Sequence, residues 1–275
     1  MKIAYQGIPG SYSESCAKAN YPGCETIACK TFDECFEIAN DDSSIKTIIP
    51  ESNKTTGNIG IEYLIFKFRL NIYAEHFYKI SHNLLAIKES KIEDIKDVYS
   101  HAQALSQSAI FIKKNNLNEQ VRADTAGSAK YVSEAKDKSK AAIASSLSAD
   151  MYDLKIIQKD IQDNQENFTR FLLMGKNIEQ PENDNKSYVT SFLFKLKSKP
   201  AALYSALQGM AINGVNMIKL QSFPEKNSFS SYFFLCEVEG HLNQQKIKNS
   251  LEDLNYHCED MSVLGVFEAD KLRKK

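Results

Sequence analysis

The chain has 275 residues, enough for one large domain or two modest ones that each bury a core. Lys and Arg total 34 against 35 Asp and Glu, and no basic stripe is interleaved with aromatic residues, which excludes nucleic acid as the main partner. No apolar run approaches the roughly 20 residues that span a bilayer. Lys2–Tyr5 leads straight into a turn with no apolar leader, so we expect a cytoplasmic protein without a membrane partner.

Six cysteines follow no paired CxxC spacing: Cys16, Cys24, Cys29, Cys35, Cys236 and Cys258. They could form a metal site or a disulfide framework, or they could be reduced and mostly buried. In an intracellular chain we expect reduced thiols. The pattern indicates neither a metal nor an organic cofactor.

The N-terminal segment predicts a short buried strand, a turn at Gln6–Gly10 and a helix that starts near Glu14, with Ser11 or Ser13 as its cap. A strand, a glycine-rich turn and a helix together point backbone N–H groups at an anion. A plain turn between strand and helix has the same pattern, and both interpretations stay open. The segment matches neither a Walker A loop nor the dinucleotide GxGxxG motif.

The next part of the chain alternates strands, polar loops and helices. We expect strands at 47–50, 70–74, 82–87, 98–101, 121–123 and 141–144, and helices at 59–68, 92–95, 102–113, 129–135 and from 147. Open α/β sheets place ligands at the polar loops that follow their strands. Thr55, Ser100, Thr125 and Thr169 all fall in such loops, where each could simply cap a helix. Because all four lie at equivalent places and Arg170 follows Thr169, we expect these residues to line a ligand-binding cleft.

The segment Asn167–Phe171 carries a hydroxyl, a guanidinium and an aromatic ring on three successive residues. A site for a small anionic ring compound needs a donor for a leaving oxygen, a fork for a carboxylate and an apolar wall. Thr169, Arg170 and Phe171 supply these three groups in that order.

Residues 177–186 are polar, contain Pro181 and lack apolar periodicity, so they predict a linker. Beyond them we expect strands at 188–196, 215–220, 232–238 and 263–267 and helices at 201–212 and 243–254. This β-α-β-β-α-β order is typical of a ferredoxin-like sandwich. Such a small sheet with an open edge commonly pairs with a copy of itself, which predicts at least a homodimer. We expect the segment 272–275 to be a solvated tail.

Five segments in order resemble the prephenate dehydratase family over nearly the whole chain. They are Gly7–Glu14, Ile49–Gly57, Ser100–Gln107, Asp124–Ala129 and Asn167–Phe171, and they are similar to the family's opening Gly-x-x-Gly-Ser/Ala-Tyr-Ser, Pro-Ile-Glu-Asn-Ser-x-x-Gly, Ser-His-Pro-Gln-Ala-Leu-x-Gln, Asp-Thr-Ala-Gly-Ser-Ala and Asn-x-Thr-Arg-Phe motifs. The C-terminal sandwich resembles the family's ACT regulatory domain.

The resemblance implies an α/β fold with a bilobal, periplasmic-binding-protein-like catalytic region, a cleft between the lobes and a ferredoxin-like ACT domain. The catalytic domain would cover 1–176, with one lobe at 1–75 and 160–176 and the other at 76–159. The linker would cover 177–186 and the ACT domain 187–270.

The implied reaction is the decarboxylating dehydration of prephenate to phenylpyruvate in L-phenylalanine biosynthesis, without a cofactor. The resemblance assigns help for the departing hydroxyl to Thr169, directly or through a relay because a threonine is a poor acid, and Arg170 would hold a carboxylate. The other expected substrate-binding residues are Ser11, Asn53, Thr55, Thr56, Ser100, Gln103, Gln107, Thr125 and Phe171. His101 is either an acid or a structural residue at a strand end.

Two regions depart from the family pattern. Ser52 replaces a Glu and Lys54 replaces a Ser; Lys54 either contacts a dianionic substrate or is a surface lysine. In the ACT segment, Ala201-Ala202-Leu203 replaces Gly-Ala-Leu, and Gln221-Ser222-Phe223-Pro224 replaces Glu-Ser-Arg-Pro. An added methyl and two lost charges predict weak or absent binding of the amino-acid effector phenylalanine at these residues.

Two other functions fit the same pattern. An arogenate dehydratase would perform the same chemistry on the transaminated substrate, with Ser106 and its neighbours setting the preference. A catalytically weak sensor would only bind aromatic metabolites, as the changes at Ser52 and Lys54 allow. A solute-binding protein shares the two-lobed cleft, but the expected ACT domain argues against it.

Overall fold

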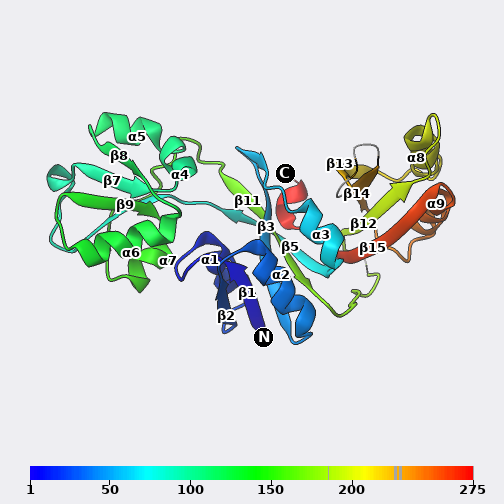
Figure 1. The fold of residues 1–275 in the computed structure, drawn as a ribbon, viewed down its shortest axis with the longest axis horizontal. Coiled ribbons are helices and arrows are strands. Elements are labelled where there is room, and N and C mark those ends of the chain that lie inside the picture. Colours follow the sequence, from blue (N-terminus) through cyan, green and yellow to red (C-terminus); the bar gives the residue numbers. More distant parts are fainter. Residues whose placement is uncertain (185, 226–227, 229–230, 275) are drawn as a thin grey trace. The chain divides into compact units, whose positions relative to one another are not determined.

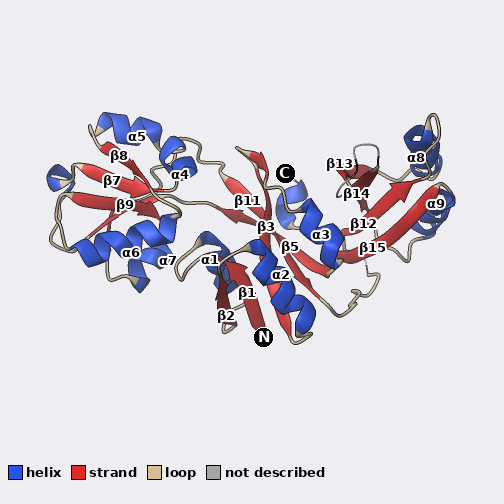
Figure 2. Cartoon of the chain, viewed as in Figure 1, coloured by secondary structure: helices blue, strands red, loops and turns tan. Residues whose placement is uncertain are grey.

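The computed structural model describes residues 1–184, 186–225, 228 and 231–274; Asn185 of the predicted linker lies outside the described residues. The chain forms two compact units. Residues 1–35, 48–59 and 76–171 make the first unit, and residues 36–47, 60–75 and 172–275 make the second. Figure 2 shows helices, strands and loops along the chain.

The first-lobe sheet has the strand order β2-β1-β3-β11-β5, with β4 paired to β3. Its strands are β1 (Lys2–Gln6), β2 (Glu25–Cys29), β3 (Ile45–Asn53), β4 (Gly57–Asn58), β5 (Asn71–Lys79) and β11 (Phe168–Gly175). The helices that come between these strands along the chain are α1 (Tyr12–Asn20), α2 (Phe32–Asp41) and α3 (Glu62–Phe68). The strands β2, β4 and β11 and the helix α2 were not predicted from the sequence.

The second-lobe sheet has the order β10-β6-β9-β7-β8. Its strands are β6 (Asn83–Ala86), β7 (Asp97–Ser100), β8 (Asn118–Val121), β9 (Lys140–Ala144) and β10 (Lys155–Gln158). Its helical segments are η1 (Ile92–Asp94), α4 (Ala102–Ser106), α5 (Ala109–Lys114), α6 (Thr125–Ala135) and α7 (Ser146–Met151).

Alternating side chains on β6 and β9 build a core on each face of the second-lobe sheet. Leu84 and Ile143 pack with α4 and α5, whereas Leu85 and Ala142 pack with α6 and α7. Successive residues of a strand point to opposite faces, so a sheet covered on both sides is apolar at every position. Figure 1 shows α4 and α5 on one side of this sheet and α6 and α7 on the other.

The predicted helix at 102–113 is wrong in one respect, because α4 and α5 are separate helices. Ser108 has φ −122° and ψ 20°, which is not helical, and it is fully buried. The carbonyl of Gln107 accepts the N–H of Asp163 at 2.7 Å instead of continuing a helix. At the break, a hydrogen bond to the loop residue Asp163 therefore replaces the helical hydrogen bond that the Gln107 carbonyl would otherwise accept.

The C-terminal segment forms the expected ferredoxin-like sandwich, with the antiparallel order β13-β14-β12-β15. Its elements are β12 (Tyr188–Leu196), α8 (Ala202–Ile212), β13 (Met217–Pro224), β14 (Tyr232–Glu239), α9 (Gln245–Tyr256) and β15 (Cys258–Glu268). Apolar residues from both helices, including Met210 and Leu251, share one core with Phe192 and Phe194.

The expectation of a solvated C-terminal tail is wrong for Arg273, which lies in the short segment η2 (Lys271–Lys274). Its guanidinium binds both carboxylate oxygens of Glu75, at 2.5 and 2.7 Å, and lies 3.2 Å from Glu237. Glu75 and Glu237 are buried, so a cationic partner offsets the desolvation of their carboxylates.

All six cysteines are free thiols, and five of them are buried. Burial raises the pKa of Cys258 to about 11 and raises that of Cys236 further. Cys24 is the exception, half-buried between α1 and β2. Among the described residues, every helix is too short or too polar to cross a membrane.

The turn before α1 is held by α7. The hydroxyls of Ser145 and Ser148 both donate to the carbonyl of Gly10, at 2.6 and 2.8 Å. Gly10 has φ +93°, and a Cβ there would lie 2.7 Å from Ser148 Oγ and 3.1 Å from Ser148 Cα. Glycine is required for its conformation and for this close approach.

We expect Gly10→Ala to destabilise the fold more than Gly23→Ala. Both positions have positive φ, which costs an L residue about 1–2 kcal/mol. A Cβ at Gly23 meets nothing within 4 Å, whereas at Gly10 it overlaps Ser148 and adds about 1–3 kcal/mol. Urea unfolding of both variants measures the difference, and equal losses would contradict the close packing at Gly10.

Candidate active site

A pocket of about 780 Å³ lies in the first unit, lined by residues from both lobes. Seven of the predicted site residues line it: Ser11, Asn53, Gln103, Gln107, Thr125, Thr169 and Phe171. Four predicted residues lie outside this lining: Thr55, Thr56, Ser100 and Arg170. The pocket is therefore lined by residues from all five sequence motifs.

The side chain of Asn53, at the end of β3, is bonded at both ends. Its Oδ1 accepts the backbone N–H groups of Thr55 and Thr56, at 2.9 and 3.1 Å. Its Nδ2 donates to Thr169 Oγ1 at 2.9 Å and to Asn167 Oδ1 at 2.8 Å. Because backbone N–H groups can only donate, they fix which end of the Asn53 amide is oxygen. Thr55 thus orients Asn53 through its backbone, and Thr56 does so through its backbone and through its hydroxyl, which donates to the same oxygen at 3.3 Å.

Thr169 lies on β11 and is 7% exposed. Its oxygen accepts a hydrogen from Asn53, so its own O–H hydrogen is not used in that bond. Within the described part of the chain, this hydroxyl hydrogen has no acceptor in the protein. The hydroxyl is thus free to donate to a molecule in the pocket, while the Asn53 amide stabilises negative charge that develops on the oxygen.

Arg170 follows Thr169 on the same strand and is buried beside Glu51. Its Nη1 lies 3.3 Å from Glu51 Oε2, with the two side chains 5% and 3% exposed. Successive strand residues point to opposite faces, and Thr169 and Phe171 line the pocket while Arg170 does not. Ser52 donates to the same Glu51 oxygen at 2.7 Å. The Thr169 hydroxyl thus faces the pocket, whereas the Arg170 guanidinium faces Glu51 on the other side of the strand.

Ser100 is fully buried at the end of β7, where its hydroxyl donates to the carbonyl of Ile143 at 2.6 Å. It ties two neighbouring strands together and does not line the pocket. Thr56 Oγ1 accepts a hydrogen bond from Gln103 Nε2 at 2.9 Å, so it orients a residue of the lining. Ser106 is exposed and lies outside the lining.

Two charged or ionisable residues singled out from the sequence, Lys54 and His101, have defined positions. Lys54 is an exposed residue paired with Glu166, as expected for a surface lysine. His101 is the N-cap of α4, where its Nδ1 accepts the N–H of Gln103 at 3.3 Å, and its ring also lines the pocket.

The Gly-rich turn offers less to an anion than its sequence suggests. Ser11 is the N-cap of α1, as predicted, and the N–H of Gly10 already donates to Glu14 Oε2 at 2.7 Å. Burial acts to raise the pKa of Glu14, but its bonds with Lys18, Gly10 and Thr26 lower it below its usual value. A carboxylate of the protein thus occupies the position closest to this turn.

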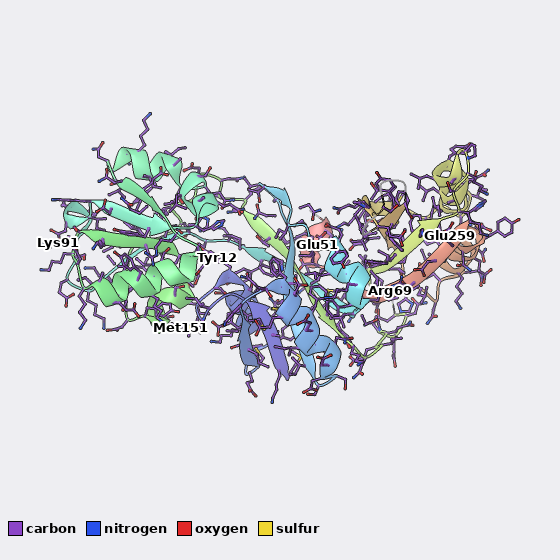
Figure 3. All side chains as sticks on the ribbon, viewed as in Figure 1. Tyr12, Glu51, Arg69, Lys91, Met151 and Glu259 are labelled. Atoms are coloured by element: carbon purple, nitrogen blue, oxygen red, sulfur yellow. The ribbon has the colours of Figure 1, made fainter. Side chains whose placement is uncertain are left out.

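Tyr12 and His82 are two of the lining residues that were not predicted as site residues. Tyr12 (labelled in Figure 3) is the first residue of α1, and its hydroxyl lies 2.7 Å from His82 Nδ1. His82 is 2% exposed, and its Nε2 lies 2.9 Å from Gln107 Oε1. Burial lowers the pKa of His82. A single histidine before a strand gave no spacing signal that could identify it.

The predicted effector residues lie in the second unit. Ala201 precedes α8 with φ +56°, and Ala202 and Leu203 begin that helix half-buried. On β13, Gln221 donates to Glu62 at 2.8 Å and Phe223 stacks on Phe233 with ring centroids 6.0 Å apart. Ser222 and Pro224 are exposed. Gln221 and Phe223 are thus committed to contacts within the protein.

Comparison with known proteins places this site in a family. The model of the prephenate dehydratase family matches residues 3–179. A prephenate dehydratase of Lactococcus lactis subsp. cremoris is 35% identical over 99% of each chain. A bifunctional N-acyl-homoserine lactone acylase/prephenate dehydratase of Komagataeibacter europaeus is 33% identical over 99% of this chain and 98% of its own. Arogenate dehydratase 2 of Petunia hybrida is 35% identical over 98% of this chain and 72% of its own.

Solved structures agree with the fold. The quorum-quenching acylase GqqA superposes with a TM-score of 0.93 at 33% identity, over 99% of this chain and 100% of its own. A prephenate dehydratase of Arthrobacter aurescens in complex with L-Phe has a TM-score of 0.87 at 23% identity, covering 98% of this chain and 90% of its own, which supports the fold alone. The expected fold, with a bilobal region and a ferredoxin-like domain, is confirmed.

We expect Glu51→Gln (Glu51 is labelled in Figure 3) to lower the free energy of unfolding by about 3 kcal/mol, because it removes a negative charge that lies 3.3 Å from the buried Arg170 guanidinium. The matched control is Glu166→Gln, which breaks the exposed pair with Lys54 and should cost about 0–1 kcal/mol. Denaturant unfolding measures both. A Glu51→Gln variant as stable as the control would show that the pair contributes little.

Proposed function

Because the chain belongs to the prephenate dehydratase family, we propose that it converts prephenate to phenylpyruvate in L-phenylalanine biosynthesis. The observation that carries this proposal is the hydroxyl of Thr169. It lies in the pocket lining, accepts a hydrogen bond from Asn53 and keeps its own hydrogen available. The reaction needs a donor for a departing hydroxyl at such a position.

The reaction removes the ring carboxylate as carbon dioxide and the ring hydroxyl as water. The electron pair of the broken C–C bond enters the ring, the C–O bond breaks, and the ring becomes aromatic. Thr169 donates a hydrogen bond or a proton to the leaving oxygen, and Asn53 stabilises the charge left on Oγ1. The hydrogen on Asn53 Nδ2 is not transferred, so a proton given by Thr169 must be restored from the pocket or from water.

A carboxylate that must lose carbon dioxide reacts faster where it is poorly solvated. Phe171 and the other apolar residues of the lining, such as Ile8, Ile59 and Ile80, supply such a wall. The neutral amides of Gln103 and Gln107 and the hydroxyls of Ser11 and Thr125 orient the substrate without adding charge to the lining.

The role of Arg170 as the holder of a substrate carboxylate stays a prediction. In this structure its Nη1 is bonded to Glu51 and its side chain does not line the pocket, so a direct contact requires the guanidinium to turn toward the pocket. The contact with Glu51 supports a second role, in which the pair fixes the strand that carries Thr169. The test of Glu51→Gln above addresses the pair itself.

An arogenate dehydratase remains the alternative, since the Petunia relative bears that name. We propose no acyl transfer like that named for the Komagataeibacter relative. A serine- or cysteine-type acylase needs a nucleophile bonded to a base. The buried histidine of the pocket, His82, is bonded to Tyr12 and Gln107 instead. The sensor function is disfavoured by the available Thr169 hydroxyl.

We also propose that residues 1–176 are the catalytic domain, 177–186 the linker and 187–270 an ACT domain that joins the chain into a homodimer or homotetramer. The β-α-β-β-α-β order of the C-terminal segment supports this division. We expect the protein to act in the cytoplasm, where reducing conditions suit its six free thiols.

Thr169→Ala is expected to keep the fold and lower kcat by about 10²–10⁴-fold, because the departing hydroxyl loses its donor. Thr169→Ser, which keeps a hydroxyl, is the matched control and should retain most activity. Phenylpyruvate formed from prephenate is followed by its absorbance in alkali, and a parallel assay with arogenate decides the substrate. A near-normal kcat in Thr169→Ala would show that Thr169 is not the donor to the departing hydroxyl.

Phenylalanine is expected to bind the ACT domain weakly or not at all. The methyl of Ala201 and the internal contacts of Gln221 and Phe223 replace the family's glycine and charges. Calorimetric titration of the protein with phenylalanine should therefore show no micromolar binding. Ala201→Gly, which removes the methyl at a positive φ, is the matched comparison. Micromolar binding by the unmodified chain would overturn this expectation.

A further inference from the structure

His82 belongs to a chain of hydrogen bonds that runs from α1 to the catalytic threonine. The chain passes from Tyr12 to His82, then to Gln107, Asn167 and Asn53. Its distances lie between 2.7 and 3.0 Å, and Asn53 connects it to Thr169. The proposed function assigns no role to Tyr12 or His82.

The direction of every bond in this chain follows from one end. Asn53 Oδ1 receives two backbone N–H groups, so Nδ2 must face Asn167. Asn167 therefore presents its oxygen to Asn53 and its Nδ2 to Gln107, 3.0 Å from Gln107 Oε1. If the Gln107 amide were turned around, its NH₂ group would face the NH₂ group of Asn167. If Asn167 were turned as well, its NH₂ group would face that of Asn53. Two donors cannot bond each other, so neither arrangement is possible.

The hydrogen on His82 follows from the position of the Gln107 oxygen. Gln107 Oε1 can only accept, so His82 Nε2 must carry a hydrogen. Burial lowers the pKa of His82 and favours the neutral ring, which leaves Nδ1 as an acceptor. Burial also raises the pKa of Tyr12, so its phenol keeps its hydrogen. The phenol oxygen lies 2.7 Å from His82 Nδ1 and 3.0 Å from the carbonyl oxygen of Ser81. Because Nδ1 carries no hydrogen in this tautomer, the shorter contact requires the phenol to donate to Nδ1.

This arrangement fixes the free end of Gln107. Its Nε2 is buried, has no hydrogen-bond partner among the described residues, and belongs to a side chain that lines the pocket. An unpaired buried donor costs about 1–3 kcal/mol, and an acceptor on a bound molecule would remove that cost. An oxygen of the substrate, from a carboxylate, hydroxyl or keto group, is such an acceptor.

We propose that His82, oriented by Tyr12, is a positioning residue that holds the Gln107 amide so that its Nε2 donates to a substrate oxygen. This inference rests on the proposed function for the identity of the substrate. The His82 tautomer and its bond to Gln107 do not depend on it. His82 touches Gln107 and not the reacting atoms, so it acts through Gln107.

The tautomer is tested in the full chain without substrate. The ring nitrogens of ¹⁵N-labelled histidine are observed by NMR at pH 7, and the signal lost in His82→Gln identifies His82 among the five histidines. We expect a neutral ring with its hydrogen on Nε2. A ring with the hydrogen on Nδ1, or a cationic ring at pH 7, would overturn the proposal.

Kinetics test the positioning role. His82→Leu should raise the KM for prephenate about tenfold with a smaller effect on kcat, because Gln107 loses its orientation. His82→Gln can still donate an N–H to Gln107 Oε1 and should stay within about threefold of the unmodified protein. A structural role alone would lower the active fraction, and hence kcat, in both variants without this recovery.

A double-mutant cycle closes the test. If His82 acts through Gln107, then His82→Leu should add little to Gln107→Leu, whereas independent effects would multiply. Multiplicative losses would contradict the proposal.

Absence of turnover by the unmodified chain on both prephenate and arogenate would contradict the proposed function, and with it the role of Gln107 in binding the substrate. The NMR spectrum would still decide the His82–Gln107 bond separately.

Discussion

The two backbone N–H groups that donate to Asn53 Oδ1 determine the chemistry of the pocket. They belong to the turn after β3, and their direction cannot be reversed. From this contact it follows that Asn53 donates to Thr169, that the Thr169 hydrogen is free, and that Gln107 faces His82 with its oxygen. A short turn of backbone thus sets the polarity of side chains from both lobes.

The sequence was a good guide to which segments meet and a poorer guide to how their side chains point. Apolar periodicity located most strands and helices, and the motifs located Asn53, Gln107 and Thr169 in one pocket. Thr169 and Arg170 were expected to share that pocket because a site for an anionic ring compound needs both a hydroxyl and a guanidinium. The sequence analysis placed Thr169 in a polar loop, but the segment is the strand β11, and neighbours on an extended strand face opposite ways.

Two other features could not be read from the sequence because they depend on long-range contacts. Ser100 looked like a loop hydroxyl, yet it bonds the carbonyl of Ile143 on a neighbouring strand. Tyr12 and His82 lie 70 residues apart along the chain and meet only after folding. The change at Ser52 is likewise explained only by its partner, since its hydroxyl donates to Glu51 and supports the buried pair with Arg170.

The distribution of thiols has a practical consequence. Five cysteines are shielded from solvent, and burial disfavours ionisation of Cys236 and Cys258, so maleimides should react with them slowly. Cys24 is the one half-exposed thiol of the six. A fluorophore or spin label could therefore be attached at a single point after α1 without first engineering a cysteine-free background.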